Sequence, residues 1–73
     1  MTKKINLSTV ADVKKFVGAA SRVSEKIELI SGKYVVDAKS IMGVFSLDLT
    51  KPVEMITETE NAEFINAIEE FLA

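Results

Sequence analysis

The sequence lacks two of the residue types that most often carry chemistry in small proteins. Its 73 residues include no histidine and no cysteine. A disulfide framework and a thiolate metal site are therefore excluded, and the commonest nitrogen ligand for a metal is missing as well. A metal would need carboxylates, and these do not cluster convincingly along the chain. We expect no metal and no other cofactor.

Long apolar runs and long basic runs are also missing. The start, MTKKINLST, has no apolar segment of signal-peptide length, and no later run approaches membrane-spanning length. Nine basic residues stand against eleven acidic ones, and the basic pairs are only Lys3–Lys4 and Lys14–Lys15. Binding to nucleic acid needs a concentrated positive face. These absences predict a cytoplasmic protein whose partner is neither a membrane nor a nucleic acid.

The length allows one small domain, residues 1–73, with a core too thin to shape a deep catalytic cavity. Hydrophobic residues make up 48% of the chain and charged residues 27%, which is the composition of a globular domain that folds alone. A monomeric interaction or carrier module therefore fits better than an enzyme.

Residue periodicity predicts the first two elements. Residues 3–7 alternate, with Ile5 and Leu7 on one face, and this predicts a strand. Ser8 or Thr9 ends this strand, and either can cap the helix that follows. Thr9 and Asp12 have the capping-box spacing, in which each side chain can satisfy a free amide of the first helical turn. The helix that follows has an apolar stripe facing a core, consisting of Val13, Phe16, Val17, Ala20 and Val23, while Lys14, Lys15 and Arg22 face outward.

A hairpin, a short helix, a strand and a last helix complete the order. Ser31 and Gly32 lie between two β-rich runs and predict a tight turn in which Gly32 has a positive φ. Residues 39–43, KSIMG, predict a short helix, and residues 52–58 predict a strand. A last helix begins at Asn61 and carries Phe64, Ile65, Ile68, Phe71 and Leu72. The order β-α-β-β-α-β-α predicts an α+β fold, an open-faced sandwich with an antiparallel sheet and its helices on one face.

Residues 32–49, GKYVVDAKSIMGVFSLDL, resemble the HPr family, the phosphocarrier proteins of the bacterial sugar phosphotransferase system. The resemblance runs from about Phe16 to the end of the chain, and Ala19–Ser21 fits the first helix of the family. The HPr-like fold has the element order predicted above. The resemblance therefore supports this order and implies a link to the phosphotransferase system.

HPr proteins carry phosphate on a histidine, and ungapped counting back from Ala20 places that position at Thr9. The arginine two residues further on falls at Ala11, and the proline after it falls at Asp12. The resemblance thus implies a member that cannot carry phosphate on histidine. A phosphothreonine ester is a poor phosphate donor, and Ala11 offers no guanidinium to neutralise phosphate. Asp12 could form an acyl phosphate, but a carboxylate in a first turn is usually there to favour the helix dipole.

Ser40 is the remaining candidate phosphorylation site. By the resemblance it matches the serine that a dedicated ATP-dependent kinase phosphorylates in HPr of low-GC Gram-positive bacteria. A serine directly before a helix has its oxygen near unpaired amides and the positive end of the dipole, which suits a phosphate. The alternative is a plain N-cap worth roughly 1 kcal/mol. Both roles can hold at once.

The short helix contains more apolar residues than one buried face can absorb. Val44 and Leu47 are predicted to be buried. This leaves Ile41, Met42 and Phe45 outward as a docking patch beside Ser40, and the matching positions of HPr proteins form the surface that partner proteins grip. The alternative is that Phe45 folds over the sheet edge and that Met42 fills a gap.

Other residues near this helix give weaker signals. Lys39 is a further predicted partner-binding residue, which could steer a phosphoryl donor or simply extend over apolar surface. Gly43 costs helix propensity, and we expect a partner or a neighbouring helix to approach it closely. Tyr34 is expected to pack its ring. Five carboxylates on separate elements are expected to form a solvated surface: Asp37, Asp48, Glu54, Glu58 and Glu60.

Three functions follow. In the first, Ser40 is phosphorylated by an HPr serine kinase and the helix then docks on a transcriptional regulator or another control protein. The resemblance offers a precedent in members that lost the histidine, kept the serine and act in carbon catabolite repression, although those members keep the arginine that Ala11 replaces here. The second is a phosphate-independent binding module that competes with true HPr for its partners. The third is a phosphotransferase-system component that accepts phosphate on Thr9 or Asp12. We favour the first.

Overall fold

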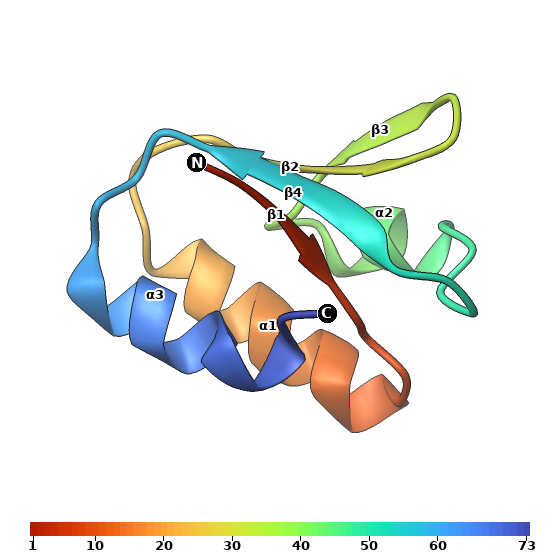
Figure 1. Ribbon diagram of the computed structural model, residues 1–73, viewed down its shortest axis with the longest axis horizontal. Coiled ribbons are helices and arrows are strands. Elements are labelled where there is room, and N and C mark those ends of the chain that lie inside the picture. Colours follow the sequence, from red (N-terminus) through yellow and green to blue (C-terminus); the bar gives the residue numbers. More distant parts are fainter.

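The computed structural model describes all 73 residues. The elements are β1 (Thr2–Ile5), α1 (Val10–Ser21), β2 (Ile27–Ser31), β3 (Tyr34–Asp37), α2 (Ile41–Phe45), β4 (Val53–Thr57) and α3 (Ala62–Ile68), which continues as the 3₁₀ turn η1 (Glu69–Phe71). The four strands form one antiparallel sheet in the order β1-β4-β2-β3. The helices lie on one face of the sheet (Figure 1). The predicted α+β open-faced sandwich is confirmed.

The first strand is shorter than predicted, because residues 6 and 7 leave the sheet. The Asn6 amide donates to the Phe71 carbonyl at 2.7 Å instead of joining the ladder with β4. Leu7 is nevertheless buried, so its predicted contact with the core holds. At the other end of the chain, Leu72 forms a bridge with Ile5, and the Ala73 amide donates to the Lys4 carbonyl. The C-terminal residues therefore cover the outer edge of β1.

The β2–β3 hairpin has its two-residue turn at Gly32 and Lys33, one residue later than predicted. Ser31 is the last residue of β2 and pairs with Tyr34, the first residue of β3. Gly32 has a φ of 59°, and no other residue in the chain has a positive φ. A positive φ at the first central position only is the pattern of a type II′ turn, which matches the twist of the two strands.

The core lies between the sheet and the helices and forms one cluster of 18 buried apolar residues. The whole predicted stripe of α1 belongs to it, and Lys14, Lys15 and Arg22 are exposed as predicted. The ring of Phe16 lies at the centre of the helical layer, with its centroid 6.2 Å from that of Phe64 and 6.4 Å from that of Phe71. From the last helix, Phe64, Ile68 and Phe71 are buried, whereas Ile65 is half-buried and Leu72 is exposed.

Two buried threonines are the polar members of the interior, and both are satisfied. The Thr57 hydroxyl donates to the Lys26 carbonyl at 2.9 Å, and the Thr59 hydroxyl donates to the Glu25 carboxylate at 3.2 Å. No buried side-chain nitrogen or oxygen lacks a hydrogen-bond partner. None of the helices has both the length and the apolar character needed to traverse a bilayer.

Candidate phosphorylation site and docking patch

Ser40 lies in the tight connection between β3 and α2 and caps the helix. Its Oγ accepts a hydrogen bond from the Gly43 amide at 3.1 Å, and its own amide donates to the Asp37 carbonyl at 3.0 Å. The Asp37 side chain also accepts from the Lys39 amide at 2.8 Å. Asp37 therefore fixes the turn that presents Ser40, and the Ser40 side chain itself is exposed. The predicted cap is present and open to solvent.

The predicted docking patch lies on the outer side of α2. Val44 and Leu47 are buried, as predicted, and α2 packs through them onto the core. Met42 is 79% exposed, Phe45 42% and Ile41 37%. Met42 therefore does not fill a gap, whereas Phe45 is more than half covered and keeps only part of its ring open to solvent.

Gly43 lies close to a strand of its own chain and not to a neighbouring helix. A Cβ atom at this position would lie 3.2 Å from the Ser40 Oγ and 3.4 Å from the Val36 Cβ on β3. The absence of a side chain therefore lets α2 sit close to β3 while Ser40 caps the helix. The expectation of a neighbouring helix is wrong, because the close neighbour is a strand; the approach of a partner stays a prediction.

Lys39 and Tyr34 flank α2 in different ways. Lys39 is half-buried and takes part in neither of the two ion pairs of the molecule. Tyr34 is 71% exposed, because it lies beside the hairpin turn on the edge strand β3. The prediction that Tyr34 packs its ring is therefore wrong.

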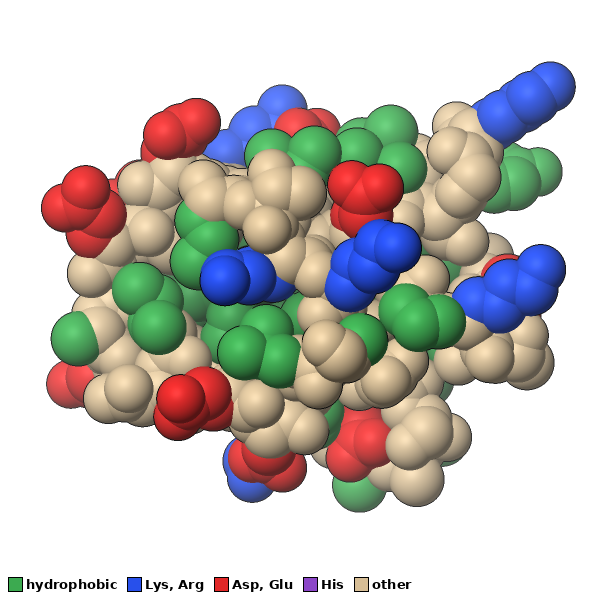
Figure 2. Space-filling model, in the orientation of Figure 1, with side chains coloured by type: hydrophobic (Ala, Val, Ile, Leu, Met, Phe, Trp, Pro, Cys, Tyr) green, Lys and Arg blue, Asp and Glu red, His purple; other side chains and the backbone are tan.

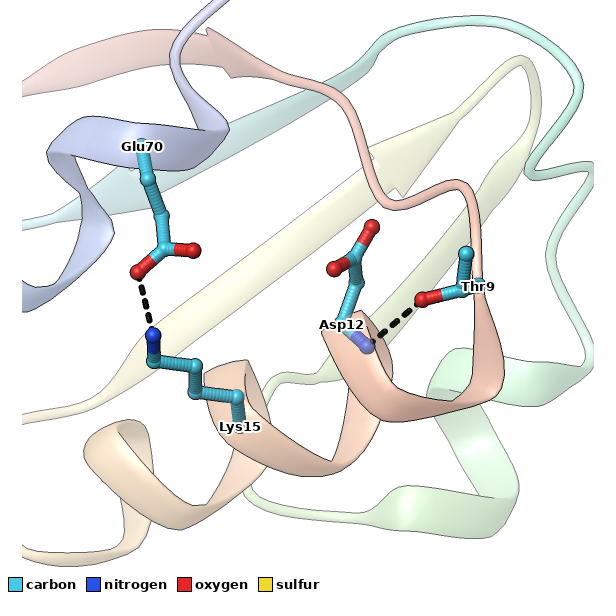
Figure 3. A network of polar contacts seen from close by, with 4 residues as sticks. All are labelled: Thr9, Asp12, Lys15 and Glu70. Carbon is cyan, nitrogen blue, oxygen red and sulfur yellow. Dashed lines mark hydrogen bonds and ion pairs between the residues drawn. The ribbon is translucent and has the colours of Figure 1, made fainter.

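Thr9, the position that the resemblance assigns to the histidine, is the N-cap of α1. Its Oγ1 accepts from the Asp12 amide at 3.0 Å (Figure 3). The Asp12 carboxylate does not return the bond to Thr9 but accepts from the Ser8 amide at 3.2 Å and from the Ser8 hydroxyl at 3.0 Å. The capping bonds at this helix start therefore involve Ser8 as well as Thr9 and Asp12, one residue more than predicted.

The hydrogen bonds at this helix start stabilise the charged form of Asp12. The Ser8 amide is the largest cause, the Ser8 hydroxyl adds to it, and the nearby polar groups of Thr9 contribute less; together they hold the pKa of Asp12 below its ordinary value. One turn later, Lys15 forms an ion pair with Glu70 of η1, which links α1 to the end of the chain (Figure 3). No cation lies among the hydrogen-bond partners of Thr9 or Asp12.

The carboxylates singled out from the sequence remain dispersed. The Asp37 carboxylate accepts a hydrogen bond from the Lys39 amide. The Asp48 carboxylate accepts from the Thr50 hydroxyl and amide, and these bonds lower the pKa of Asp48. Acidic residues do not gather anywhere in groups of three or more that could hold a metal ion. On the face drawn in Figure 2, side chains of both charge signs are interspersed.

A shallow hollow between the hairpin turn and the loop after α2 was not predicted from the sequence. It is lined by Ser31, Gly32, Lys33, Tyr34, Ser46, Asp48 and Lys51. These residues come from two separate segments, residues 31–34 and 46–51, and no spacing along the chain groups them. Only the packing of α2 beneath the hairpin brings them together.

Comparison with known proteins defines the class. The family model described as "PTS HPr component phosphorylation site" matches residues 11–73. The chain therefore belongs to the HPr family of the phosphotransferase system, whose members are phosphocarriers that interact with other proteins of the system and are not enzymes. The matched residues include Ser40 and begin two residues after Thr9.

A solved structure supports this assignment. The chain is similar to HPr-C-His from Thermoanaerobacter tengcongensis, with 30% identity and a TM-score of 0.74, over 96% of this chain and 85% of that one. No curated protein sequence gives a significant match.

Proposed function

We propose that this HPr-family protein is a regulatory member that accepts phosphate on Ser40 from an HPr serine kinase and then docks through α2 on a control protein of the cytoplasm. The observation that carries the proposal is the placement of Ser40. Its hydroxyl is exposed, caps a helix and adjoins the docking patch of Ile41, Met42 and Phe45. Ser40 is thus an accessible acceptor for phosphate, and its phosphorylation would alter the surface beside it.

The sequence argues against the phosphocarrier chemistry of histidine. The chain has no histidine, and Thr9, which stands where the resemblance places it, has its hydroxyl engaged with the Asp12 amide. A histidine phosphoramidate keeps a high transfer potential that a threonine ester lacks. The carboxylate of Asp12 also stands one turn from Thr9 and would repel a phosphate there.

The surroundings of Ser40 favour a phosphate more than those of Thr9. The first turn of α2 contains no acidic residue, whereas the first turn of α1 contains Asp12. A phosphoryl group on Ser40 would bring up to two negative charges to the free amides of α2, where they are favourable. It would also place a charged group at the border of the docking patch.

The test is the intact-protein mass after incubation with an HPr serine kinase and ATP. We expect a single phosphate on the native chain and none on Ser40→Ala. Ser46→Ala is the matched control, because Ser46 is an exposed serine at the other end of the same helix, and this variant should gain the phosphate. An unmodified native chain, or loss of phosphate from Ser46→Ala alone, would refute the proposal.

A second candidate function is phosphate-independent docking, in competition with true HPr for proteins of the phosphotransferase system. The observation in its favour is that Met42 and Phe45 are already exposed without phosphate on Ser40. In a competition assay against a true HPr for the general phosphotransfer enzyme, Met42→Ser with Phe45→Ser should lose binding while Ser40→Ala keeps it. Dependence of binding on phosphorylated Ser40 would exclude this second function.

A further inference from the structure

The hollow between the hairpin turn and the loop after α2 is the one concave site of ligand size in the molecule. Figure 1 shows both segments at the same end of the protein. The hollow has a volume of about 580 Å³, which lies within the range of sites that bind small molecules. No aliphatic side chain lines it, and Tyr34 is its only aromatic residue. Such a lining indicates a hydrophilic ligand.

Two lysines line the hollow from its two segments. Lys33 lies in the hairpin turn and Lys51 in the loop after α2. Both are exposed, and neither takes part in the two ion pairs of the molecule. Asp48 is the only acidic residue of the lining, so the hollow is positive although the chain as a whole has a net charge of −2. The two lysines match the charge of one phosphate monoester at neutral pH.

The Asp48 carboxylate has one oxygen free for a ligand. Its Oδ1 accepts both bonds from Thr50, whereas its Oδ2 accepts no hydrogen bond in the structure. An ionised carboxylate only accepts hydrogen bonds, so Oδ2 suits a hydroxyl donor such as those of a ribose. The same charge would repel a bare phosphate placed beside it. The lining therefore favours an anion that also carries hydroxyl groups.

Tyr34 offers a flat aromatic surface at this site. Its side chain is 71% exposed and does not belong to the core cluster. A nucleobase stacks favourably on an aromatic side chain, whichever base it is, because every base has a π-face. A purine presents the larger face of the two kinds of base. The exposed ring next to Lys33 thus adds a base to the phosphate and hydroxyl groups that the rest of the lining favours.

We propose that this hollow binds a purine nucleoside monophosphate. The base stacks on Tyr34, the ribose hydroxyls donate to the free oxygen of Asp48, and the phosphate lies between Lys33 and Lys51. A di- or triphosphate would bring more negative charge than two lysines neutralise. The hollow contains neither Ser40 nor a residue of the docking patch, so this proposal holds or fails independently of the proposed function.

The first test is a titration of the backbone amide NMR signals with adenosine monophosphate at constant ionic strength. The ligand is taken to about 20 mM, because exposed lysines and an open site give weak binding. We expect saturable shifts in residues 31–34 and 46–51. Ribose 5-phosphate, which lacks the base, should bind about tenfold more weakly. Adenosine, which lacks the phosphate, should also bind more weakly.

Three results of this titration would overturn the proposal. The absence of saturable shifts in the two segments would show that the hollow is not a nucleotide site. Equal affinity for ribose 5-phosphate would show that no base stacks on Tyr34. Equal affinity for inorganic phosphate would show that the two lysines attract anions in general.

Variants at exposed residues test the roles of the individual side chains. Tyr34→Leu should lower the affinity for adenosine monophosphate about tenfold, whereas Tyr34→Phe keeps the ring and should keep the affinity. Lys51→Gln should lower it about threefold. Lys14→Gln makes the same charge change on α1, outside the hollow, and should leave the affinity unchanged.

Circular dichroism checks that each variant remains folded, which we expect because all of these side chains are exposed. Native affinity in Tyr34→Leu would refute the stacking. A loss in Lys14→Gln as large as that in Lys51→Gln would refute a phosphate position in the hollow.

Discussion

Ser40 and Thr9 show how one local contact can have two different surroundings. Each hydroxyl accepts a hydrogen bond from the amide three residues ahead, and each begins a helix. At α1 the first turn already contains a carboxylate, Asp12, which accepts two bonds from Ser8. At α2 the first turn contains no acid and the serine is exposed. At the scale of single residues, the first turn of α1 therefore contains a negative charge, whereas the first turn of α2 contains none.

At this scale we predict a pH-dependent contribution from Asp12. Because folding lowers the pKa of Asp12, its charged form stabilises the native state; this stabilisation is present above the unfolded pKa and is lost as the pH falls through the folded pKa. Asp12→Asn should therefore be less stable than the native chain at pH 7, and the difference should shrink as the pH falls below the ordinary pKa of aspartate, about 3.9. Urea denaturation at a series of pH values measures it.

The control for the Asp12 prediction is Glu60→Gln. This variant makes the same change in net charge at an exposed side chain that accepts no hydrogen bond in the structure. A stability difference for Asp12→Asn that stays constant from about pH 7 to about pH 2.5, or that Glu60→Gln reproduces, would show that the Ser8 bonds do not stabilise the charged form.

At the scale of elements, the two helical glycines have different reasons to be there. Gly18 lies within α1 and has open space where a Cβ would stand. Gly43 lies within α2, where a Cβ would meet Ser40 and Val36 at 3.2 to 3.4 Å. The helix propensity of alanine acts equally at both positions, but only at Gly43 does packing against a strand oppose it.

We predict that Gly18→Ala stabilises the protein by roughly 0.5–1 kcal/mol, since it lowers the entropy lost on folding without a clash. Gly43→Ala should not give this gain and should reduce stability, because either α2 moves away from β3 or the Ser40 cap is distorted. Chemical denaturation of both variants tests the pair. Equal stabilisation by the two substitutions would mean that α2 has room beside β3.

At the scale of the whole molecule, three aromatic rings join the helical layer. Phe16 of α1 is fully buried, and its ring contacts Phe64 of α3 at a tilted angle and Phe71 of η1 edge-on. Such pairs add to the stabilisation that burial provides. Because a domain of this size is stable by only about 4–11 kcal/mol, a single ring can account for a large share of that stability.

We predict that Phe16→Ala costs about 3–5 kcal/mol and leaves the chain partly or wholly unfolded at about 37 °C. Phe45→Ala makes the same chemical change at a partly exposed residue outside the core cluster and should cost less, about 1 kcal/mol. Thermal unfolding followed by circular dichroism compares the two. Similar losses from both variants would show that Phe45 belongs to the core or that Phe16 does not hold the helices together.

Most of the fold could be predicted because its signals are local. The apolar stripe of α1, the inward Val44 of α2 with Leu47 just after it, and the glycine of the hairpin are all confirmed. The errors arose where a neighbour came from elsewhere in the chain. Tyr34 has a strand-forming sequence context, but its place on an edge strand leaves the ring exposed.

The sequence by itself determined the order of the elements, the caps at Thr9 and Ser40 and the absence of histidine, because periodicity, capping and composition act within a few residues. Only the tertiary structure decided that β3 is the edge strand opposite β1, that Val36 lies close to the Cβ position of Gly43 and that Phe16 meets Phe64 and Phe71. These contacts join segments far apart in the chain. Their geometry depends on how the sheet and helices pack together, and no local pattern encodes it.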